Sequence, residues 1–320
     1  MPILVVGSVA LDSVATPFGH ADDTLGGTAM FFTAAASLYD RVNLVAIVGD
    51  DFPEADLNYL RSCNVDLDGL QVSPGKTFRW GARYALDMNS RQTLFTELGV
   101  FADFHPVVPE AYRHSAIIFL ANIQPQLQLE VLEQTSAAAS TDEEAPLVAL
   151  DTMNLWIDTT RDALTAVLRR VEVVLMAEEE VRQYANTPSL RVGARQIFEL
   201  GPKLLVIKQG SYGALLLGAD GSYFAAPSYP LEDVRDPTGA GDAFAGGFLG
   251  ALAAERARGR ALTLSDYRRA LVHGNIMGSF ACEDFSVNRL RGLTPADISA
   301  RYRELVDYTH FEGSWRGETH

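Results

Sequence analysis

Short apolar runs alternate with segments of helical spacing through most of this 320-residue chain, and this alternation limits the folds that it can adopt. A run that is apolar on both faces fits a strand that helices cover on both sides, as in a parallel sheet. The sequence therefore predicts a doubly wound α/β architecture, a mostly parallel sheet flanked by helices. The expected strands are 3–9, 43–48, 116–120, 147–151, 171–176, 204–208 and 214–217, and the expected helices are 28–38, 54–63, 127–139, 160–169, 178–185, 189–200, 242–253, 265–280 and 295–308.

Two segments, about 12–24 and 66–101, interrupt the alternation because they are rich in β-forming residues and turns. Residues 87–90 fit a hairpin turn between two stretches of alternating polarity. We expect these segments to form a small β-sheet lid, inserted in one domain that spans 1–320. The lid carries aromatic residues interleaved with arginines, namely Phe78, Trp80, Tyr84, Phe95, Arg79, Arg83 and Arg91. They could cover a substrate, or they could be ordinary sheet packing.

Composition and simple motifs narrow the classes of function. The chain has 26 basic and 41 acidic residues and a net charge of −15, which disfavours nucleic acid or an anionic membrane as a partner. Its two cysteines, Cys63 and Cys282, form no CxxC pair, and the start lacks a signal-peptide pattern, so we expect a cytoplasmic protein. The six histidines have no metal-ligand spacing, and neither GxGxxG nor GxxxxGK[ST] occurs. A zinc enzyme, a Rossmann dehydrogenase and a P-loop enzyme are therefore disfavoured.

A glycine-rich turn in DPTGAGDAFAGG, residues 236–247, opens a predicted helix that begins near Asp242. The small residues Gly239, Ala240 and Gly241 would let their N–H groups converge on an anion, since the first amides of a helix lack intrahelical acceptors. If a phosphoryl donor lay over these amides, Asp242 could accept the proton of an attacking hydroxyl. The alternative is that Asp242 only caps the helix, but the glycine run before it favours the anion site.

Polar residues also follow the expected strand 147–151. Asp151 and Asn154 lie at its carboxyl end, which is the edge of an open α/β sheet where ligands bind. Both are candidate site residues, and a helix cap or a turn is the equally weighted alternative.

The motif DPTGAGDAFAGG resembles the signature of the ribokinase-like (PfkB) carbohydrate kinase family, which also includes nucleoside kinases. The early GSVALD, followed by Gly26 and Gly27, is similar to the family's first strand and di-glycine substrate motif, and IKQGSYG at 207–213 resembles its turn beside the nucleotide. The resemblance covers nearly the whole chain. It implies a ribokinase-like fold and an ATP- and Mg²⁺-dependent kinase that transfers the γ-phosphate to a primary hydroxyl of a small sugar.

The resemblance also implies roles for individual residues. Asp242 matches the catalytic base, and the amides of Gly239, Ala240 and Gly241 match the anion hole. The matched or candidate substrate-binding residues are Asp12, Gly26, Gly27, Phe31 and Asn154; the nucleotide-binding ones are Lys208, Gly210, Ser211, Gly213, Thr238 and Asn275. Asp236, together with Thr238, matches a site for a monovalent cation such as K⁺.

The chain departs from the family pattern at two positions. Phe31 stands where the family often has an Asn that binds a sugar hydroxyl, and it can offer packing or stacking but no hydrogen bond. In the NxxE motif, Glu180 matches the Glu that places Mg²⁺ through water, but Ala177 replaces the Asn.

These departures keep two alternatives open, a nucleoside (adenosine-like) kinase and a non-catalytic ligand-binding or degenerate kinase. The partner implied is a small sugar or nucleoside, with no nucleic acid and no membrane, and the lid suggests a homodimer.

Overall fold

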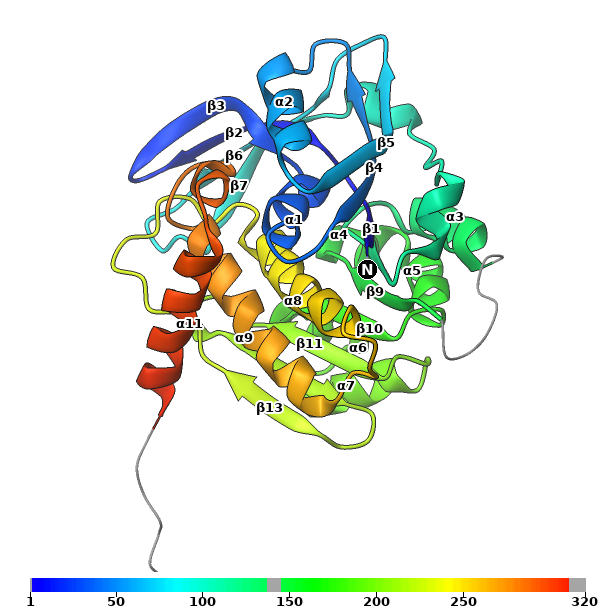
Figure 1. Ribbon diagram of the computed structural model, residues 1–320, viewed down its shortest axis with the longest axis vertical. Coiled ribbons are helices and arrows are strands. Elements are labelled where there is room, and N and C mark those ends of the chain that lie inside the picture. Colours follow the sequence, from blue (N-terminus) through cyan, green and yellow to red (C-terminus); the bar gives the residue numbers. More distant parts are fainter. Residues whose placement is uncertain (1, 137–144, 311–320) are drawn as a thin grey trace, which may run out of the picture.

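The computed structural model describes residues 2–136 and 145–310, and its central element is a nine-stranded sheet (Figure 1). The strand order is β13-β12-β11-β10-β9-β8-β1-β4-β5. Their bounds are β1 Ile3–Val6, β4 Val42–Gly49, β5 Val65–Ser73, β8 Ile117–Leu120, β9 Leu147–Asp151, β10 Val173–Ala177, β11 Leu204–Lys208, β12 Ala214–Gly218 and β13 Tyr223–Ala226. Neighbours from β11 to β5 pair in parallel, and only β12 and β13 add antiparallel pairs at one edge. The expected mostly parallel sheet is confirmed.

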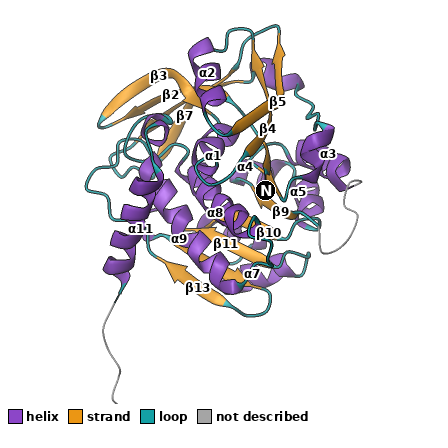
Figure 2. Cartoon of the chain, viewed as in Figure 1, coloured by secondary structure: helices purple, strands orange, loops and turns teal. Residues whose placement is uncertain are grey.

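Helices cover both faces of this sheet and divide the interior into two cores, as Figure 2 shows by the helices on either side of the strands. One face carries α1 Thr28–Ala36, α2 Glu54–Ser62, α8 Ala240–Arg256, α9 Leu264–Ala281, α10 Asn288–Arg291 and α11 Pro295–Thr309; the other carries α3 Pro125–Ser136, α4 Asn154–Thr159, α5 Arg161–Leu168, α6 Glu178–Ala185 and α7 Leu190–Phe198. Along β1, Ile3 and Val5 enter the first core, whereas Leu4 and Val6 enter the second. The uninterrupted apolar runs of the strands therefore reflect burial on both faces.

Small residues allow α8 to pack closely between α1 and α9. A Cβ atom on Gly246 would lie 2.5 Å from the backbone oxygen of Phe32, and one on Gly247 would lie 2.6 Å from that of His273. Such distances are too short for any larger residue. The two glycines lower the helix propensity of α8, but they bring its backbone against both neighbours. The amino end of α8 is therefore held firmly at the carboxyl edge of the sheet.

A separate four-stranded sheet, ordered β3-β2-β6-β7, forms the lid and projects beyond the ends of α1 and α8 (Figure 1). Its strands are β3 Gly19–Gly26, β2 Ala10–Thr16, β6 Phe78–Tyr84 and β7 Arg91–Glu97. The lid expected at 66–101 is wrong in part, because all of β5 except Val65 falls in that range and yet β5 pairs in parallel with β4 in the main sheet. The helix α2 connects β4 to β5 as a crossover, which allows β5 to join that sheet.

The strand β13 and the short helices α4 and α10 were not expected, and other boundaries differ modestly from the expected ones. The helix expected at 127–139 extends past the described residues, and α8 begins at Ala240, two residues before Asp242. None of the helices in 2–136 and 145–310 combines the length and apolar character that crossing a membrane requires.

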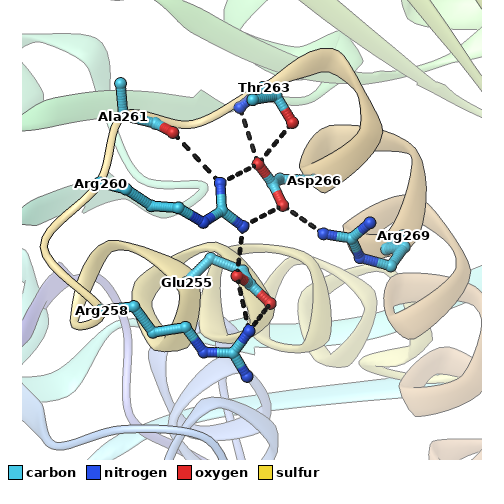
Figure 3. Close-up of polar contacts among 7 residues, drawn as sticks. All are labelled: Glu255, Arg258, Arg260, Ala261, Thr263, Asp266 and Arg269. Carbon is cyan, nitrogen blue, oxygen red and sulfur yellow. Dashed lines mark hydrogen bonds and ion pairs between the residues drawn. The ribbon is translucent and has the colours of Figure 1, made fainter.

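The loop between α8 and α9 is closed by charged side chains around Asp266, whose side chain is fully buried (Figure 3). Arg260 donates to both carboxylate oxygens of Asp266 at 2.7 Å, and Thr263 donates to one of them through its N–H and its hydroxyl, also at 2.7 Å. Arg269 pairs with the same carboxylate, and Arg260 also reaches Glu255 at 2.6 Å. The bonds from Arg260, with those from Thr263, hold the pKa of Asp266 well below its usual range despite its burial.

Replacing this carboxylate should destabilise the fold. We expect Asp266→Asn to lower the free energy of unfolding by about 2 kcal/mol at neutral pH, because charge-assisted hydrogen bonds are lost. A carboxylate with a depressed pKa stabilises the fold above its unfolded-state pKa of about 4 and loses that effect as the pH falls further. Urea unfolding at several pH values should therefore show the two proteins converging below about pH 4.

Glu255→Gln is the matched control, since the side chains of the arginines that Glu255 pairs with, Arg258 and Arg260, are 68% and 41% exposed. This substitution should lower the free energy of unfolding by less than about 1 kcal/mol. Equal losses for the two variants, at every pH, would contradict this account of the loop.

Candidate active site

The turn before α8 has an unusual backbone geometry that depends on one aromatic contact. Gly239, the N-cap of α8, has a φ of 73°, in the left-handed region that favours glycine. A Cβ atom at this position would lie 2.2 Å from the ring of Phe31, so the ring supports the turn directly. Phe31 is only 2% exposed. The structure therefore places the apolar ring of Phe31 beneath the turn, and its expected contact with the substrate stays a prediction.

Some backbone N–H groups of this turn have a hydrogen-bond acceptor within the protein, and others do not. The N–H of Ala240 donates to the backbone oxygen of Pro237 at 3.2 Å. Within the described part of the chain, the N–H groups of Gly239, Gly241 and Asp242 have no hydrogen-bond acceptor. The Ala240 N–H was expected to bind an anion, but it already donates a hydrogen bond within the turn. Three neighbouring donors remain for an anion at the positive end of the α8 dipole.

The carboxyl group of Asp242 lies beside these amides in an environment that favours its neutral form. Burial raises the pKa of Asp242 to about 8, and the nearby carboxylate of Asp151 adds to this effect. The positive charges of Lys208 and Arg91 act in the opposite direction. A carboxyl group whose pKa lies near neutral pH is well suited to accept and release a proton.

Lys208, the last residue of β11, brings a positive charge to the same place. Its Nζ lies 2.6 Å from Oδ2 of Asp151, the last residue of β9, and a Cβ atom on Gly241 would lie 3.4 Å from that Nζ. Burial alone would lower the pKa of Lys208, but the charges of Asp151 and Glu180 raise it above its usual value. The ammonium therefore stays charged beside the free amides of α8.

Asp151 thus lies beside Lys208, whereas the role expected of Asn154 in substrate binding stays a prediction. Asp151 is almost fully buried, with a 3% exposed side chain. Asn154 begins α4, is exposed, and does not line the cavity described below.

The residues expected to bind the substrate lie where the lid meets α1. Asp12 of β2 accepts a hydrogen bond from the Gly27 N–H at 3.3 Å, and a Cβ atom on Gly26 would lie 2.0 Å from its Oδ2. Only glycine permits this contact. Burial raises the pKa of Asp12 to about 7, although the Gly27 N–H lowers it. In the lid sheet, Asp12 is paired with Trp80 of the parallel strand β6, so both side chains lie on one face.

A cavity of about 560 Å³ lies next to this site, between the carboxyl end of β11, the start of α8, and α9. Its lining includes seven residues expected at the anion hole or the nucleotide, namely Lys208, Gly210, Ser211, Gly213, Ala240, Gly241 and Asn275. Asn275 also donates to the backbone oxygens of Ala226 and Pro227, at 3.1 and 3.0 Å, and so ties α9 to the end of β13. The size and position of the cavity suit a nucleotide.

The residues near the cavity can accommodate a hard cation. Among the residues described, no three His, Cys, Asp or Glu side chains converge as a ready-made metal site. Glu180 accepts the Ala177 N–H at 2.7 Å and retains a second oxygen, and burial raises its pKa to about 7. Asp151 is near enough to affect that pKa. Mg²⁺ is commonly held by one or two carboxylates together with substrate phosphates, so this donor set fits it.

Asp236 is buried just before the turn that begins α8. It accepts the Thr238 N–H at 2.9 Å, and burial raises its pKa. Thr238 in turn donates its hydroxyl to the Tyr84 hydroxyl of the lid at 3.2 Å. The expected monovalent-cation site at Asp236 stays a prediction.

Sequence reasoning missed several cavity residues, among them two groups in loops. The first is the lid turn, with Asp87, Met88 and Asn89, and the second is the loop 228–234 after β13. Neither has a periodic pattern or a ligand motif. The only signal was the predicted hairpin turn at 87–90, which did not indicate what the turn contacts.

Comparison with known proteins identifies relatives along most of the chain. A family model described as pfkB family carbohydrate kinase matches residues 12–289. A cytidine kinase from Thermococcus kodakarensis is 32% identical over 266 residues, which is 82% of this chain and 91% of the relative. A 2-dehydro-3-deoxygluconokinase from Thermoproteus tenax is 29% identical over 262 residues, or 78% and 79% of the two chains.

Solved structures of other proteins share the fold. The structure of a candidate ribokinase II from E. coli in complex with ATP and Mg²⁺ matches with a TM-score of 0.76 and 20% identity, over 94% of this chain and 99% of that one. At this identity the likeness concerns the fold. Because the family model spans both the lid strand that carries Asp12 and the turn before α8, this chain belongs to the pfkB family of carbohydrate kinases.

Proposed function

We propose that this kinase transfers the γ-phosphate of ATP to a hydroxyl group of a nucleoside, with Asp242 as the base. One observation carries the proposal: Asp242 lies beside three free amides at the start of α8, next to a cavity that suits a nucleotide. ATP and Mg²⁺ are further supported by the E. coli relative that contains both. The degenerate-kinase alternative is disfavoured, since base, amides and ammonium all lie together.

A nucleoside is favoured as the acceptor over a simple sugar for two reasons. The T. kodakarensis relative is named a cytidine kinase, and this chain covers 91% of it. In addition, the lid carries Trp80 on the same face as Asp12, where an aromatic ring could stack on a base while the carboxylate binds ribose hydroxyls. The guanidinium of Arg91 lies over Trp80, 5.5 Å from the ring centroid.

A sugar acid is the second candidate. The T. tenax relative is named a 2-dehydro-3-deoxygluconokinase, and Arg91 places a positive charge where a carboxylate could bind.

In the proposed reaction, Asp242 takes the proton as the acceptor oxygen attacks the γ-phosphorus and the bond to the leaving ADP oxygen breaks. Because the transition state of phosphoryl transfer is loose, catalysis depends mainly on positioning the two substrates and on stabilising the charge of the transferred group. The amides of Gly239, Gly241 and Asp242 donate to the oxygens of the phosphoryl group. Lys208, held by Asp151, adds a positive charge beside them. Glu180 and Asp151 would hold Mg²⁺, which neutralises charge on the phosphates when it is bound.

Removing the base should abolish turnover and spare nucleotide binding. We expect Asp242→Asn to lower kcat by about 10³-fold, because the amide has nearly the same shape but cannot accept the proton. Calorimetric titration with a non-hydrolysable ATP analogue should give a Kd within about threefold of that of the unmodified enzyme. Asp162→Asn, at an exposed position in α5, serves as control. Turnover of Asp242→Asn within about tenfold of normal would exclude this base.

The pH dependence of kcat/KM should reflect the protonation of Asp242. Since burial raises the pKa of Asp242 to about 8, kcat/KM for the acceptor should rise with pH through this value as the base loses its proton. Lys208→Met should move the rise to higher pH, because the ammonium lowers the pKa of Asp242, whereas Lys208→Arg should retain the charge. A profile that falls through this range, or a shift to lower pH in Lys208→Met, would contradict the assignment.

An acceptor screen should identify the substrate class. Thermal shift with cytidine, adenosine, ribose and 2-dehydro-3-deoxygluconate measures binding to the native state, since only ligands of that state stabilise it. We expect nucleosides to raise Tm more than ribose does, and Trp80→Leu to remove most of that difference. If the sugar acid alone raises Tm, and Arg91→Gln abolishes the shift, the second candidate is the correct one.

A further inference from the structure

Tyr229, in the loop between β13 and α8, lines the cavity that suits a nucleotide and is held there by α11, which lies beside α9 (Figure 1). The Tyr229 hydroxyl donates to Glu304 at 2.7 Å, and Cζ of Arg301 lies over the Tyr229 ring, 4.4 Å from its centroid. The ring of Tyr308 packs beside it, with 6.0 Å between the two centroids. Because positions 301, 304 and 308 share one face of a helix, α11 holds this side chain by its ring and by its hydroxyl.

Arg301 is itself held in one orientation. Its side chain is only 12% exposed, and its Cζ also lies over the ring of Phe280, near the end of α9, 3.5 Å from the centroid. The guanidinium donates to the Ser279 hydroxyl at 3.0 Å and pairs with Glu283. A planar guanidinium that is stacked on aromatic rings and bonded through both terminal nitrogens has little freedom to turn. Arg301 therefore gives the Tyr229 ring a fixed support.

Four polar side chains line the cavity near this ring, and each already donates its hydrogens within the protein. Both N–H groups of the Asn275 amide go to backbone oxygens at the end of β13, as described above. Ser279 and Ser228 donate their hydroxyls to backbone oxygens, and the Tyr229 hydroxyl is bound to Glu304. These four side chains therefore offer a bound base contact surface but no free hydrogen.

Apolar residues line the cavity beside Tyr229. Pro230 and Leu231 follow it in the same loop, and Phe244 of α8 lines the cavity as well. The charged group of the lining, Lys208, lies with the free amides of α8, where phosphates would bind. An apolar wall that carries an aromatic ring suits the planar base of the same nucleotide.

We propose that Tyr229 binds the base of the phosphate donor by stacking, that Arg301 is the positioning residue for its ring, and that the donor is selected by the shape of its base and not by hydrogen bonds to the base edge. This inference rests on the proposed function, since it takes the cavity as the ATP site. Stacking tolerates different bases, because every base has a π-face. A triphosphate with another purine base should therefore serve as donor almost as well as ATP.

The unmodified enzyme tests how the donor is selected. The assay measures kcat/KM for ATP and for GTP with Mg²⁺ and with whichever of the four screened acceptors is phosphorylated. We expect the two values to agree within about tenfold, because a site that binds the base edge by hydrogen bonds discriminates by about 10⁴-fold. A larger preference for ATP would show that the edge is recognised, and would overturn this part of the inference.

Substitutions at the two residues test the stacking contact and its support. Calorimetric titration with the Mg²⁺ complex of a non-hydrolysable ATP analogue should show a Kd about tenfold higher in Tyr229→Leu, with kcat at saturating ATP within about threefold of normal, since the reacting groups stay in place. Tyr229→Phe should retain most of the affinity. Tyr223→Leu is the matched control, because Tyr223 of β13 is 54% exposed and does not line the cavity.

A double-mutant cycle separates positioning by Arg301 from a general effect on stability. We expect Arg301→Met to raise the Kd of the ATP analogue about threefold in the unmodified enzyme and to have no further effect in Tyr229→Leu, since a positioning residue acts only through the ring. Equal effects in both backgrounds would show that Arg301 does not act through Tyr229.

The outcomes separate this inference from the proposed function. If the unmodified enzyme phosphorylates an acceptor with ATP, but Tyr229→Leu binds the analogue as Tyr223→Leu does, the ring does not bind the base and the inference fails. Should Tyr229→Leu not fold, an unchanged Kd in Arg301→Met would overturn it in the same way. If the unmodified enzyme neither binds the analogue nor consumes ATP, the proposed function itself is wrong.

Discussion

At the carboxyl edge of the main sheet, a single ammonium group is surrounded by carboxyl groups and offsets part of their negative charge. Lys208 lies 2.6 Å from Asp151 and near both Glu180 and Asp242. Three carboxylates in one poorly solvated region would repel each other, so the arrangement depends on this positive charge. One ammonium cannot neutralise all three. Burial, with a smaller contribution from the charge of Asp151, raises the pKa of both Glu180 and Asp242, which leaves them able to hold a proton or share a second cation.

Backbone packing places this cluster opposite the free amides. The glycines of α8 bring the helix against α1 and α9, and the ring of Phe31 supports Gly239 in its left-handed conformation. The turn therefore has a fixed shape before any ligand binds. Fixed donors need little reorganisation when charge develops near them, and this is the chief advantage of a backbone anion site over one built from flexible lysines.

The sequence predicted most of the fold because its strands are buried on both faces, and such runs are easily recognised. Asp242 and the turn before it were predictable for a similar reason, since glycines and a carboxylate at a helix start are a local pattern. The edge strand β5 was missed because it is only half-buried and its alternation resembles that of a lid strand. Phe31, the Ala240 amide and the lid turn depend on contacts between segments distant in the chain. Neither propensity nor periodicity reports such contacts.

The position of Asp12 has a consequence for how such an enzyme can diversify. This carboxylate belongs to β2, a strand of the lid sheet, and not to the nine-stranded sheet that carries Lys208 and Asp151. Under the proposed function, the groups that select the acceptor therefore belong to one module, and those that handle the phosphates belong to another. Substitutions in the small sheet can alter which alcohol is accepted while the phosphate-handling framework stays intact, so a new specificity can arise without rebuilding the core.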